Sequence, residues 1–237
     1  DGTDQAFATL ILIPDGIGTI ALCDARRLVD QGFAVVIFHP DGRGRSEGKE
    51  DFNGVIHQDG LAAVVRAATS FQGVDESQIG LVSFSHGVTL ASGTLARHPD
   101  LSVRFLIDWE GPADRKDTTL GCKADQRIAW PACEDDPAWL QREAVTFISK
   151  IAVPYQRLQS TKDHALPDTT HALRMVNAAV EGSTPWVRLN DYPAGTSFDL
   201  QSPPAMLPEK ADSSVELLIA SYAHQLLTLS VSTRIVY

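Results

Sequence analysis

The chain has 237 residues, 43% of them hydrophobic and 21% charged, which is typical of a globular protein and excludes a disordered chain. Its formal net charge of −10 disfavours binding to nucleic acids or anionic membranes, because phosphate groups bind cationic surfaces. The apolar runs are far too short for a membrane span, which needs about 20 residues. We therefore expect a soluble protein with no nucleic-acid or membrane partner.

Cysteine content and the first residue leave the cellular compartment open. The chain begins with Asp1, so it is compatible with the cytoplasm or with export after removal of a leader. Cys23 lies in a helical pattern and is predicted to be a small core residue. Cys122 and Cys133 flank a short polar segment and could pair in an exported protein. No CxxC or HExxH spacing occurs, so neither a metal nor another cofactor is predicted.

The first half of the chain alternates apolar runs with amphipathic segments. The runs are short, rich in β-branched residues and bounded by Pro or Gly, as in buried strands, and they cover residues 8–13, 33–38, 79–84 and 103–107. The segments between them have apolar residues at helical spacing, over 19–31, 55–71 and 86–97. Strands that are apolar throughout and separated by helices predict a parallel sheet covered on both faces.

The pattern is interrupted in the middle of the chain and then resumes. Residues 111–136 show no clear period, and a helix is predicted over 137–150. The later elements are strands over 153–159 and 186–189 and helices over 169–181 and 212–229. We find no repeat and no linker. The prediction is one α/β domain over residues 1–237, with a cap-like insertion at about 111–150.

The main functional motif is the sequence Ser83-Phe84-Ser85-His86-Gly87, between a predicted strand and a predicted helix. A sharp turn there lifts the hydroxyl of Ser85 above the carboxyl edge of the sheet. The turn needs small residues two positions before and after the nucleophile, and Ser83 and Gly87 satisfy this need. The alternative is a serine that only caps the helix.

With this motif the chain resembles the α/β-hydrolase fold family, and especially its dienelactone-hydrolase and acyl-peptidase-like branches. The loop over 40–48 looks like the family's Asp-x-Arg-Gly-x-Gly-x-Ser loop, and the segment over 15–18 occupies the place of its His-Gly-x-Gly oxyanion loop. The resemblance covers residues 6–110 well and 152–230 more loosely. The family's N-terminal antiparallel hairpin is expected to be missing, because the chain starts almost at the first parallel strand.

The resemblance implies a role for several residues. Ser85 would attack an acyl carbon, and the backbone N–H groups of Ile17 and His86 would hold the oxyanion. Asp163 would be the acid that orients the base, four residues before a proline as in the family. A turn or helix-capping role is the alternative for this aspartate. Glu110, directly after the fourth strand, is a second candidate acid or a substrate contact.

The base is the uncertain member, because the region after the last strand, where the family carries its histidine, contains none. His164 adjoins Asp163 and is our first candidate, and His171 at the start of the next helix is the second. The other histidines considered are His39, His57, His86 and His224. Any single histidine is more often structural than catalytic, so the choice rests on the need of Ser85 for a nearby base.

These observations support three hypotheses about function. The leading one is a serine hydrolase that cleaves a small ester or related acyl bond. The alternatives are a non-catalytic binding protein with this fold, because the usual histidine is absent, and a peptidase for short peptides. The insertion is expected to cover Ser85. Trp109 and Glu110 are candidate pocket residues, and Trp130 and Trp139 are candidate apolar walls. The sequence does not specify the substrate or the oligomeric state.

Overall fold

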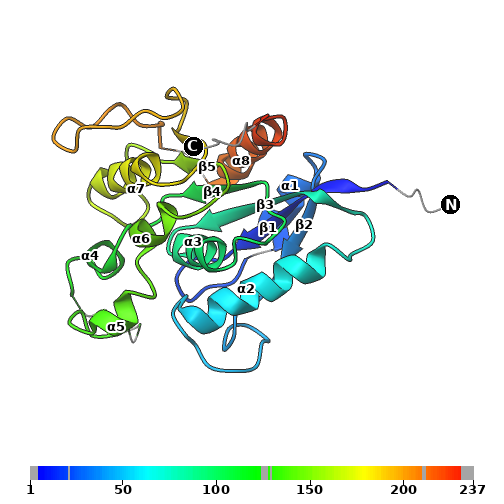
Figure 1. The fold of residues 1–237 in the computed structure, drawn as a ribbon, viewed down its shortest axis with the longest axis horizontal. Coiled ribbons are helices and arrows are strands. Elements are labelled where there is room, and N and C mark those ends of the chain that lie inside the picture. Colours follow the sequence, from blue (N-terminus) through cyan, green and yellow to red (C-terminus); the bar gives the residue numbers. More distant parts are fainter. Residues whose placement is uncertain (1–4, 21, 124–127, 129, 210–211, 231–237) are drawn as a thin grey trace, which may run out of the picture.

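The computed structural model describes residues 5–20, 22–123, 128, 130–209 and 212–230. Their strands form one six-stranded sheet in the order β2-β1-β3-β4-β5-β6, and every neighbouring pair is parallel (Figure 1). The strands are β1 (Phe7–Ile13), β2 (Ala34–Ile37), β3 (Val74–Phe84), β4 (Phe105–Trp109), β5 (Tyr155–Leu158) and β6 (Val187–Leu189). The sequence-based prediction of a parallel α/β sheet is confirmed.

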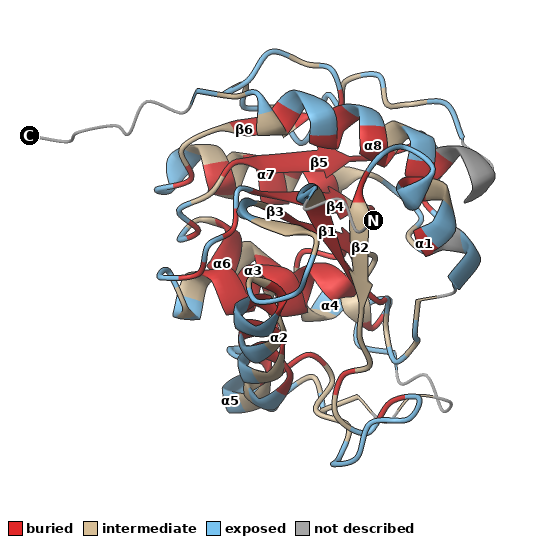
Figure 2. Ribbon diagram, turned by 90° about the vertical axis from the view of Figure 1, so that its right-hand side faces the viewer, coloured by how far each residue is buried: buried red, intermediate tan, exposed pale blue. Residues whose placement is uncertain are grey.

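Helices cover both faces of this sheet. One face packs against α2 (Val55–Ala68), α3 (Gly87–Arg97), α6 (Ala144–Ile148) and α7 (Thr170–Glu181). The other face packs against α1 (Leu22–Val29) and α8 (Asp212–Leu227). Figure 2 shows the central strands buried between the two helical layers, whereas the edge strand β2 is of intermediate burial.

Successive side chains of a strand point alternately into the hydrophobic cores on the two faces of the sheet. Ile11 and Ile13 of β1 belong to the core under α2 and α3, whereas Leu10 and Leu12 belong to the core under α1 and α8. This alternation follows from the two-residue period of a strand. Both sets of side chains are buried, so the strand is apolar throughout, as the sequence pattern indicated.

The register of the sheet brings the carboxyl ends of β3, β4 and β5 level with one another. Phe84 pairs with Trp109, which in turn pairs with Leu158. Backbone hydrogen bonds continue beyond the strands, from Ser85 N–H to Trp109 O at 2.8 Å and from Glu110 N–H to Leu158 O at 3.1 Å. The residues that follow these three strands therefore lie side by side at one edge of the sheet.

The segment between β4 and β5 differs from the prediction in its details. The helix expected over 137–150 is two short helices, α5 (Asp136–Trp139) and α6, and the irregular part contains a further one, α4 (Arg115–Thr118). The break between α5 and α6 turns Arg142 inward, where its guanidinium pairs with Asp51 at 2.6 Å.

The structure agrees with the expected pairing of two cysteines and corrects the expected burial of the third. Cys122 and Cys133 form a disulfide, with their Cα atoms 5.6 Å apart. Cys23, which was expected in the core, is exposed on α1, because Ala25 and Leu28 supply that helix's buried side chains.

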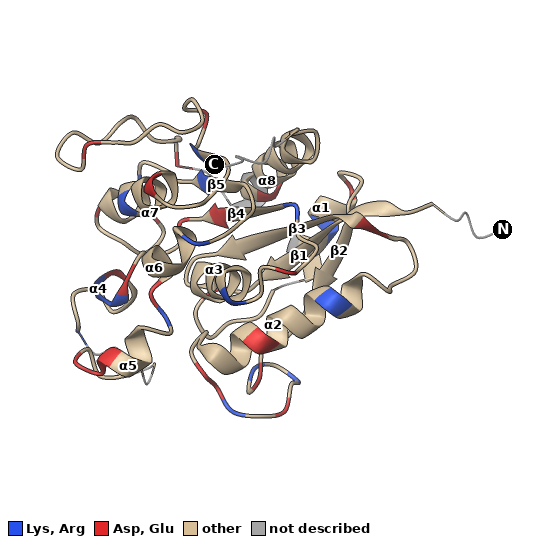
Figure 3. Ribbon diagram, in the orientation of Figure 1, with Lys and Arg blue, Asp and Glu red and all other residues tan. Residues whose placement is uncertain are grey.

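Positive and negative side chains are interspersed over the described part of the fold. Figure 3 shows both signs on single helices, such as Asp59 and Arg66 of α2. None of the described helices is long and apolar enough to cross a bilayer.

Candidate active site

Ser85 occupies a sharp turn between β3 and α3. Its φ of 49° lies in the left-handed region, which is uncommon for a residue with a side chain and is found where function requires the strain. Close packing holds this turn in place. A Cβ atom on Gly87 would lie only 2.6 Å from the carbonyl oxygen of Pro14, so the start of α3 approaches the end of β1 as only glycine allows.

Glu110 forms a second left-handed turn, at the end of the neighbouring strand β4. Its φ is 50°, and it is followed by Gly111, where a Cβ atom would lie 2.8 Å from the carbonyl oxygen of Ser85. The two strained turns are therefore packed against each other. This contact fixes the Glu110 carboxylate beside the nucleophile turn.

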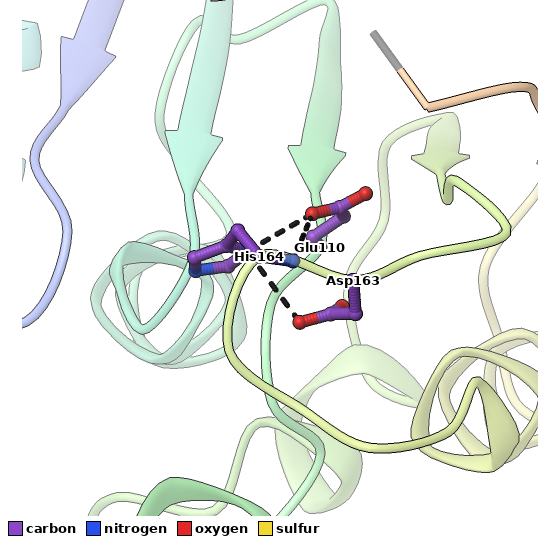
Figure 4. A group of neighbouring side chains, drawn as sticks. All are labelled: Glu110, Asp163 and His164. Atoms are coloured by element: carbon purple, nitrogen blue, oxygen red, sulfur yellow. Dashed lines mark hydrogen bonds and ion pairs between the residues drawn. The ribbon is translucent and has the colours of Figure 1, made fainter.

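His164 connects these two residues. Its Nε2 lies 2.9 Å from Ser85 Oγ. Its Nδ1 lies 2.9 Å from Glu110 Oε2, and Figure 4 shows this pairing. The backbone N–H of His164 donates to the same carboxylate oxygen at 3.0 Å, and Ser160 N–H donates to the other at 3.1 Å. An ionised carboxylate only accepts hydrogen bonds, so Nδ1 carries the proton and Nε2 is free to accept one from Ser85.

The surroundings of Glu110 and His164 stabilise the charged form of both side chains. Burial raises the pKa of Glu110, but hydrogen bonds from His164 and Ser160 outweigh it, and the carboxyl pKa is lower than usual. Burial lowers the pKa of His164, but the hydrogen bond to Glu110 and the charges of Asp163, Glu110 and Asp15 outweigh it, so its pKa is raised. An imidazolium formed at His164 is therefore stabilised by its surroundings.

The ring of His164 is also held by stacking. It lies on the indole of Trp109, with ring centroids 4.8 Å apart and the planes inclined by 23°. The His164 side chain keeps 31% of its surface exposed, so one side of the pair is open to a substrate. The predicted pocket residue Trp109 therefore contacts the candidate base directly.

Asp163 lies in the same loop but is engaged elsewhere. Its Oδ1 is 3.5 Å from His164 Nδ1, farther than Glu110, and it accepts the N–H groups of Ala165 and Leu166 at 2.8 Å. Its Oδ2 lies 3.2 Å from Nε2 of His171. The geometry therefore favours Glu110 over Asp163 as the carboxylate partner of His164, and gives Asp163 the task of shaping the loop.

His171 is buried on the inner side of this loop. Its Nδ1 lies 3.0 Å from Gly111 O and 3.2 Å from a guanidinium nitrogen of Arg157. None of the recorded contacts among the described residues joins this ring to Ser85. The structure thus brings His164 to Ser85 and leaves His171, the second candidate base, beneath the site.

A buried ionic network underlies both histidines. Arg157 and Asp108 are fully buried, and their side chains pair at 2.6 Å, while Tyr155 donates to Asp108 at 2.9 Å. Burial raises the pKa of Asp163, but hydrogen bonds from His171, Gln159 and the loop backbone outweigh it, and its pKa is far below the usual range. The loop that carries His164 therefore rests on a negatively charged Asp163.

One of the two candidate oxyanion donors, His86, directly follows Ser85 in the chain. Neither Ile17 N–H nor His86 N–H has a protein acceptor among the described residues. The ring of His86 is buried, which together with the charges of Arg43 and Arg142 lowers its pKa to about 3. This neutral ring takes no part in the base chemistry.

The loop before α2 positions His86. Asn53 donates to His86 O at 2.8 Å and lies 3.1 Å from its Nδ1. Arg43 in turn holds Asn53 at 2.8 Å and pairs with Glu50 at 2.7 Å. Arg43, from the loop over 40–48, therefore does not contact Ser85 directly. It holds Asn53, which in turn positions His86, the residue after Ser85.

The insertion reaches the same turn through Trp130. Its indole lies 4.9 Å from the His86 ring, and it also packs against Phe52 at 5.5 Å and Trp139 at 6.4 Å. Trp139 itself is fully buried and is thus an internal support of the insertion. That the insertion covers Ser85 stays a prediction, and residues 124–127 and 129 fall outside the described residues.

Glu110, Asp163 and His164 also offer a set of possible metal ligands. One ligand atom from each lies within 4.8 Å of the others. Two carboxylates and an imidazole suit a divalent cation such as Zn²⁺. In the present arrangement both ring nitrogens of His164 are already directed at protein groups, so the pairing with Ser85 and Glu110 accounts for this cluster.

No protein-family model and no curated protein matches the sequence. Solved structures do match. A puromycin-hydrolysing peptidase from Mycobacterium tuberculosis has a TM-score of 0.70 at 14% identity, over 97% of this chain and 35% of that one. The esterase Pf2001 from Pyrococcus furiosus has a TM-score of 0.63 at 15% identity, over 95% of this chain and 82% of that one.

A truncated carbohydrate esterase from gut microbiota matches with a TM-score of 0.67 at 13% identity, over 96% of this chain and 88% of that one. The chain has the α/β-hydrolase fold. It spans about a third of the length of the peptidase, 35%, and most of the length of both esterases. At these identities the α/β-hydrolase likeness establishes the architecture, and the chemistry has to be argued from the site.

One departure from the usual α/β-hydrolase arrangement lies after β6, where the resemblance places the family's histidine. That turn contains Asn190, with a φ of 46°. Its side chain accepts the N–H of Gln159 at 2.9 Å and donates to Gln159 O at 3.0 Å. Asn190 thus closes the loop after β5, the loop that carries His164.

Glu110, the second candidate acid in the sequence, lies closer to His164 Nδ1 than Asp163 does, at 2.9 Å against 3.5 Å. The signal that could have favoured it is its position directly after β4, before Gly111 and Pro112. That position places its side chain at the carboxyl edge beside the nucleophile strand.

Proposed function

We propose that the protein is a serine hydrolase that cleaves a small ester or related acyl bond, with Ser85 as nucleophile, His164 as base and Glu110 as the orienting acid. The observation that carries the proposal is the pair of 2.9 Å contacts on opposite nitrogens of one imidazole, to Ser85 Oγ and to Glu110. A nucleophile, a base and a group that orients the base are the three parts that acyl transfer requires.

In the first half of the reaction Ser85 Oγ attacks the acyl carbon as its proton passes to Nε2 of His164. The positive charge then formed on the ring is stabilised by Glu110, which stays ionised. The carbonyl oxygen becomes an oxyanion between the N–H groups of Ile17 and His86. Each such donor contributes about 3–4 kcal/mol to stabilising the transition state.

The tetrahedral intermediate then breaks down to the acyl-enzyme. The bond from carbon to the leaving group breaks, and the leaving group takes the proton from Nε2 of His164 as it departs. In the second half a water molecule gives its proton to the same nitrogen and attacks the acyl carbon. Ser85 recovers its proton from His164, and the carboxylic acid leaves.

The base position supports an enzyme over a binding protein with the same fold. The case for a non-catalytic protein rested on the missing histidine after the last strand. His164 reaches Ser85 from the loop after β5, so the missing residue has a substitute. Ser85 and His164 are both partly exposed, so a small molecule can reach them, and we infer a small-molecule substrate.

Covalent labelling tests this proposal directly. We expect a fluorophosphonate probe to add one phosphonyl group to the protein, measured by intact mass, and the Ser85→Ala variant to remain unlabelled. Ser92→Ala is the matched control, because this serine is buried in α3 and donates to Val88 O at 2.7 Å. It should label like the wild type.

His164→Ala separates catalysis from accessibility. The proposal requires that this variant label much more slowly than the wild type while its circular dichroism spectrum is unchanged. If the wild-type protein does not label, or if labelling persists in Ser85→Ala, the serine-hydrolase proposal is wrong and the binding-protein hypothesis replaces it.

A further inference from the structure

A cavity of about 280 Å³ opens beside the candidate active site, on the side of the sheet covered by α8. Phe84 and Trp109 form its aromatic part, with ring centroids 6.2 Å apart, and Ile20 and Val215 add aliphatic surface. The carboxylates of the lining belong to Asp15 and Glu216.

The cavity is joined to the reacting groups through the backbone. Phe84 directly precedes Ser85, Trp109 directly precedes Glu110, and Asp15 lies two residues before Ile17. The Trp109 indole that lines the cavity also stacks on His164 at 4.8 Å. His164 gives its proton to the leaving group, so the cavity lies on the leaving-group side of the proposed reaction.

The charge of the cavity is negative. Among the described residues, its lining contains two carboxylates and no Lys, Arg or His. Glu216 pairs with Arg27 at 3.3 Å, which offsets its charge. Asp15 has no cationic partner within the described residues, and its charge contributes to raising the pKa of His164.

We propose that this cavity binds a cationic group of the leaving alcohol, an ammonium or quaternary ammonium carried on a short aliphatic arm. The inference rests on the proposed hydrolase function and adds a substrate class to it. The Asp15 carboxylate attracts the cation, and the aromatic rings of Phe84 and Trp109 that line the cavity offer cation–π contact.

Competing ligand classes fit the cavity less well. An anionic leaving group would face Asp15 and Glu216 without a lining cation to balance it. A neutral alkyl group would use the aromatic part and leave the attraction of Asp15 unused. The positive charge is therefore what distinguishes the preferred substrate, and Asp15 is the residue that determines this specificity.

A matched pair of esters tests the inference. The acetates of choline and of 3,3-dimethylbutanol have the same shape and differ only in that a quaternary nitrogen replaces a quaternary carbon. We expect the ratio of their kcat/KM values to fall about five- to tenfold in Asp15→Asn, which is the size of a partly exposed charge attraction together with cation–π contact. Comparing ratios cancels the intrinsic reactivity of the two esters.

Glu76→Gln is the matched control, because it removes the same charge from the opposite end of β3. Its ratio should equal that of the wild type. An equal ratio in Asp15→Asn and wild type would overturn the inference while leaving the hydrolase function intact. Failure of a wild type that labels at Ser85 to hydrolyse either ester would also overturn the inference alone, whereas absence of labelling would overturn the hydrolase function as well.

A second pair of esters tests which side of the bond the cavity serves. The methyl esters of trimethylglycine and of 3,3-dimethylbutanoic acid carry the same difference in charge on the acyl side. Their ratio should change less than twofold in Asp15→Asn. A larger change here than in the choline pair would contradict the assignment of the cavity to the leaving group.

Discussion

The loop and helix after β5 carry two histidines that each pair with a carboxylate, and only one of these histidines contacts Ser85. His164 pairs with Glu110 at 2.9 Å and keeps part of its ring exposed toward Ser85. His171 pairs with Asp163 at 3.2 Å and is buried, and the guanidinium of Arg157 lies on its other nitrogen. The chemistry available to each pair is thus decided by what its second ring nitrogen meets, not by the pairing itself.

Replacing the outer histidine should give the largest effect. His164→Ala removes the base, and we expect kcat to fall about 10⁴- to 10⁶-fold, because loss of the base alone removes most of the catalysis in such a unit. The melting temperature should stay nearly constant, since the ring is partly exposed. Ester hydrolysis and thermal unfolding measure the two effects. Near-normal turnover in this variant would contradict the claim that the His164–Glu110 pair is catalytic and the His171–Asp163 pair is not.

Glu110→Gln should cost about 10³- to 10⁴-fold in kcat, because an amide can hold the ring but cannot stabilise its charge. The variant also tests the pH dependence. His164 must be neutral to act, and its pKa is raised, so wild-type kcat/KM should rise with pH through a midpoint above the usual value of about 6.5.

Removing the charge of Glu110 lowers the pKa of His164 and moves that midpoint to lower pH. The pH profile of kcat/KM in wild type and variant reads out the shift. An unmoved midpoint would mean that Glu110 does not act on His164.

The inner pair should affect stability instead of chemistry. His171→Ala leaves Asp163 and Arg157 without one of their buried partners, and we expect the free energy of unfolding to fall by about 2–4 kcal/mol. Urea denaturation measures this loss. The kcat of the folded fraction should fall far less than in His164→Ala, and a comparable fall in both variants would show that the two pairs are not distinct.

The smallest effect is expected in the insertion. The disulfide between Cys122 and Cys133 closes the segment that carries Trp130, and Trp130 packs on His86, a candidate oxyanion donor. A Cys122→Ser/Cys133→Ser double variant should loosen this contact and lower kcat about two- to fivefold. Enzyme assays of the variant, with reduced wild type as a second sample, measure the change. Unchanged kcat in both samples would place the insertion outside the catalytic unit.

The parallel sheet and the sharp turn at Ser85 were predictable, because they depend on local patterns. Apolar runs such as 8–13 identify buried strands, and the small residues around Ser85 identify the sharp turn. The pairing of His164 with Glu110 was harder to predict, since it depends on the register that brings the ends of β4 and β5 together. Asp163 follows the family's pattern in sequence, yet the loop directs its carboxylate toward His171.

The central claim is that Glu110, not Asp163, is the acid of the catalytic unit. It is tested most directly by measuring kcat for Glu110→Gln and Asp163→Asn on one ester, with both variants shown to be folded by circular dichroism. Our account predicts a loss of about 10³-fold or more in Glu110→Gln and at most about tenfold in Asp163→Asn. A greater loss in folded Asp163→Asn than in Glu110→Gln would contradict it.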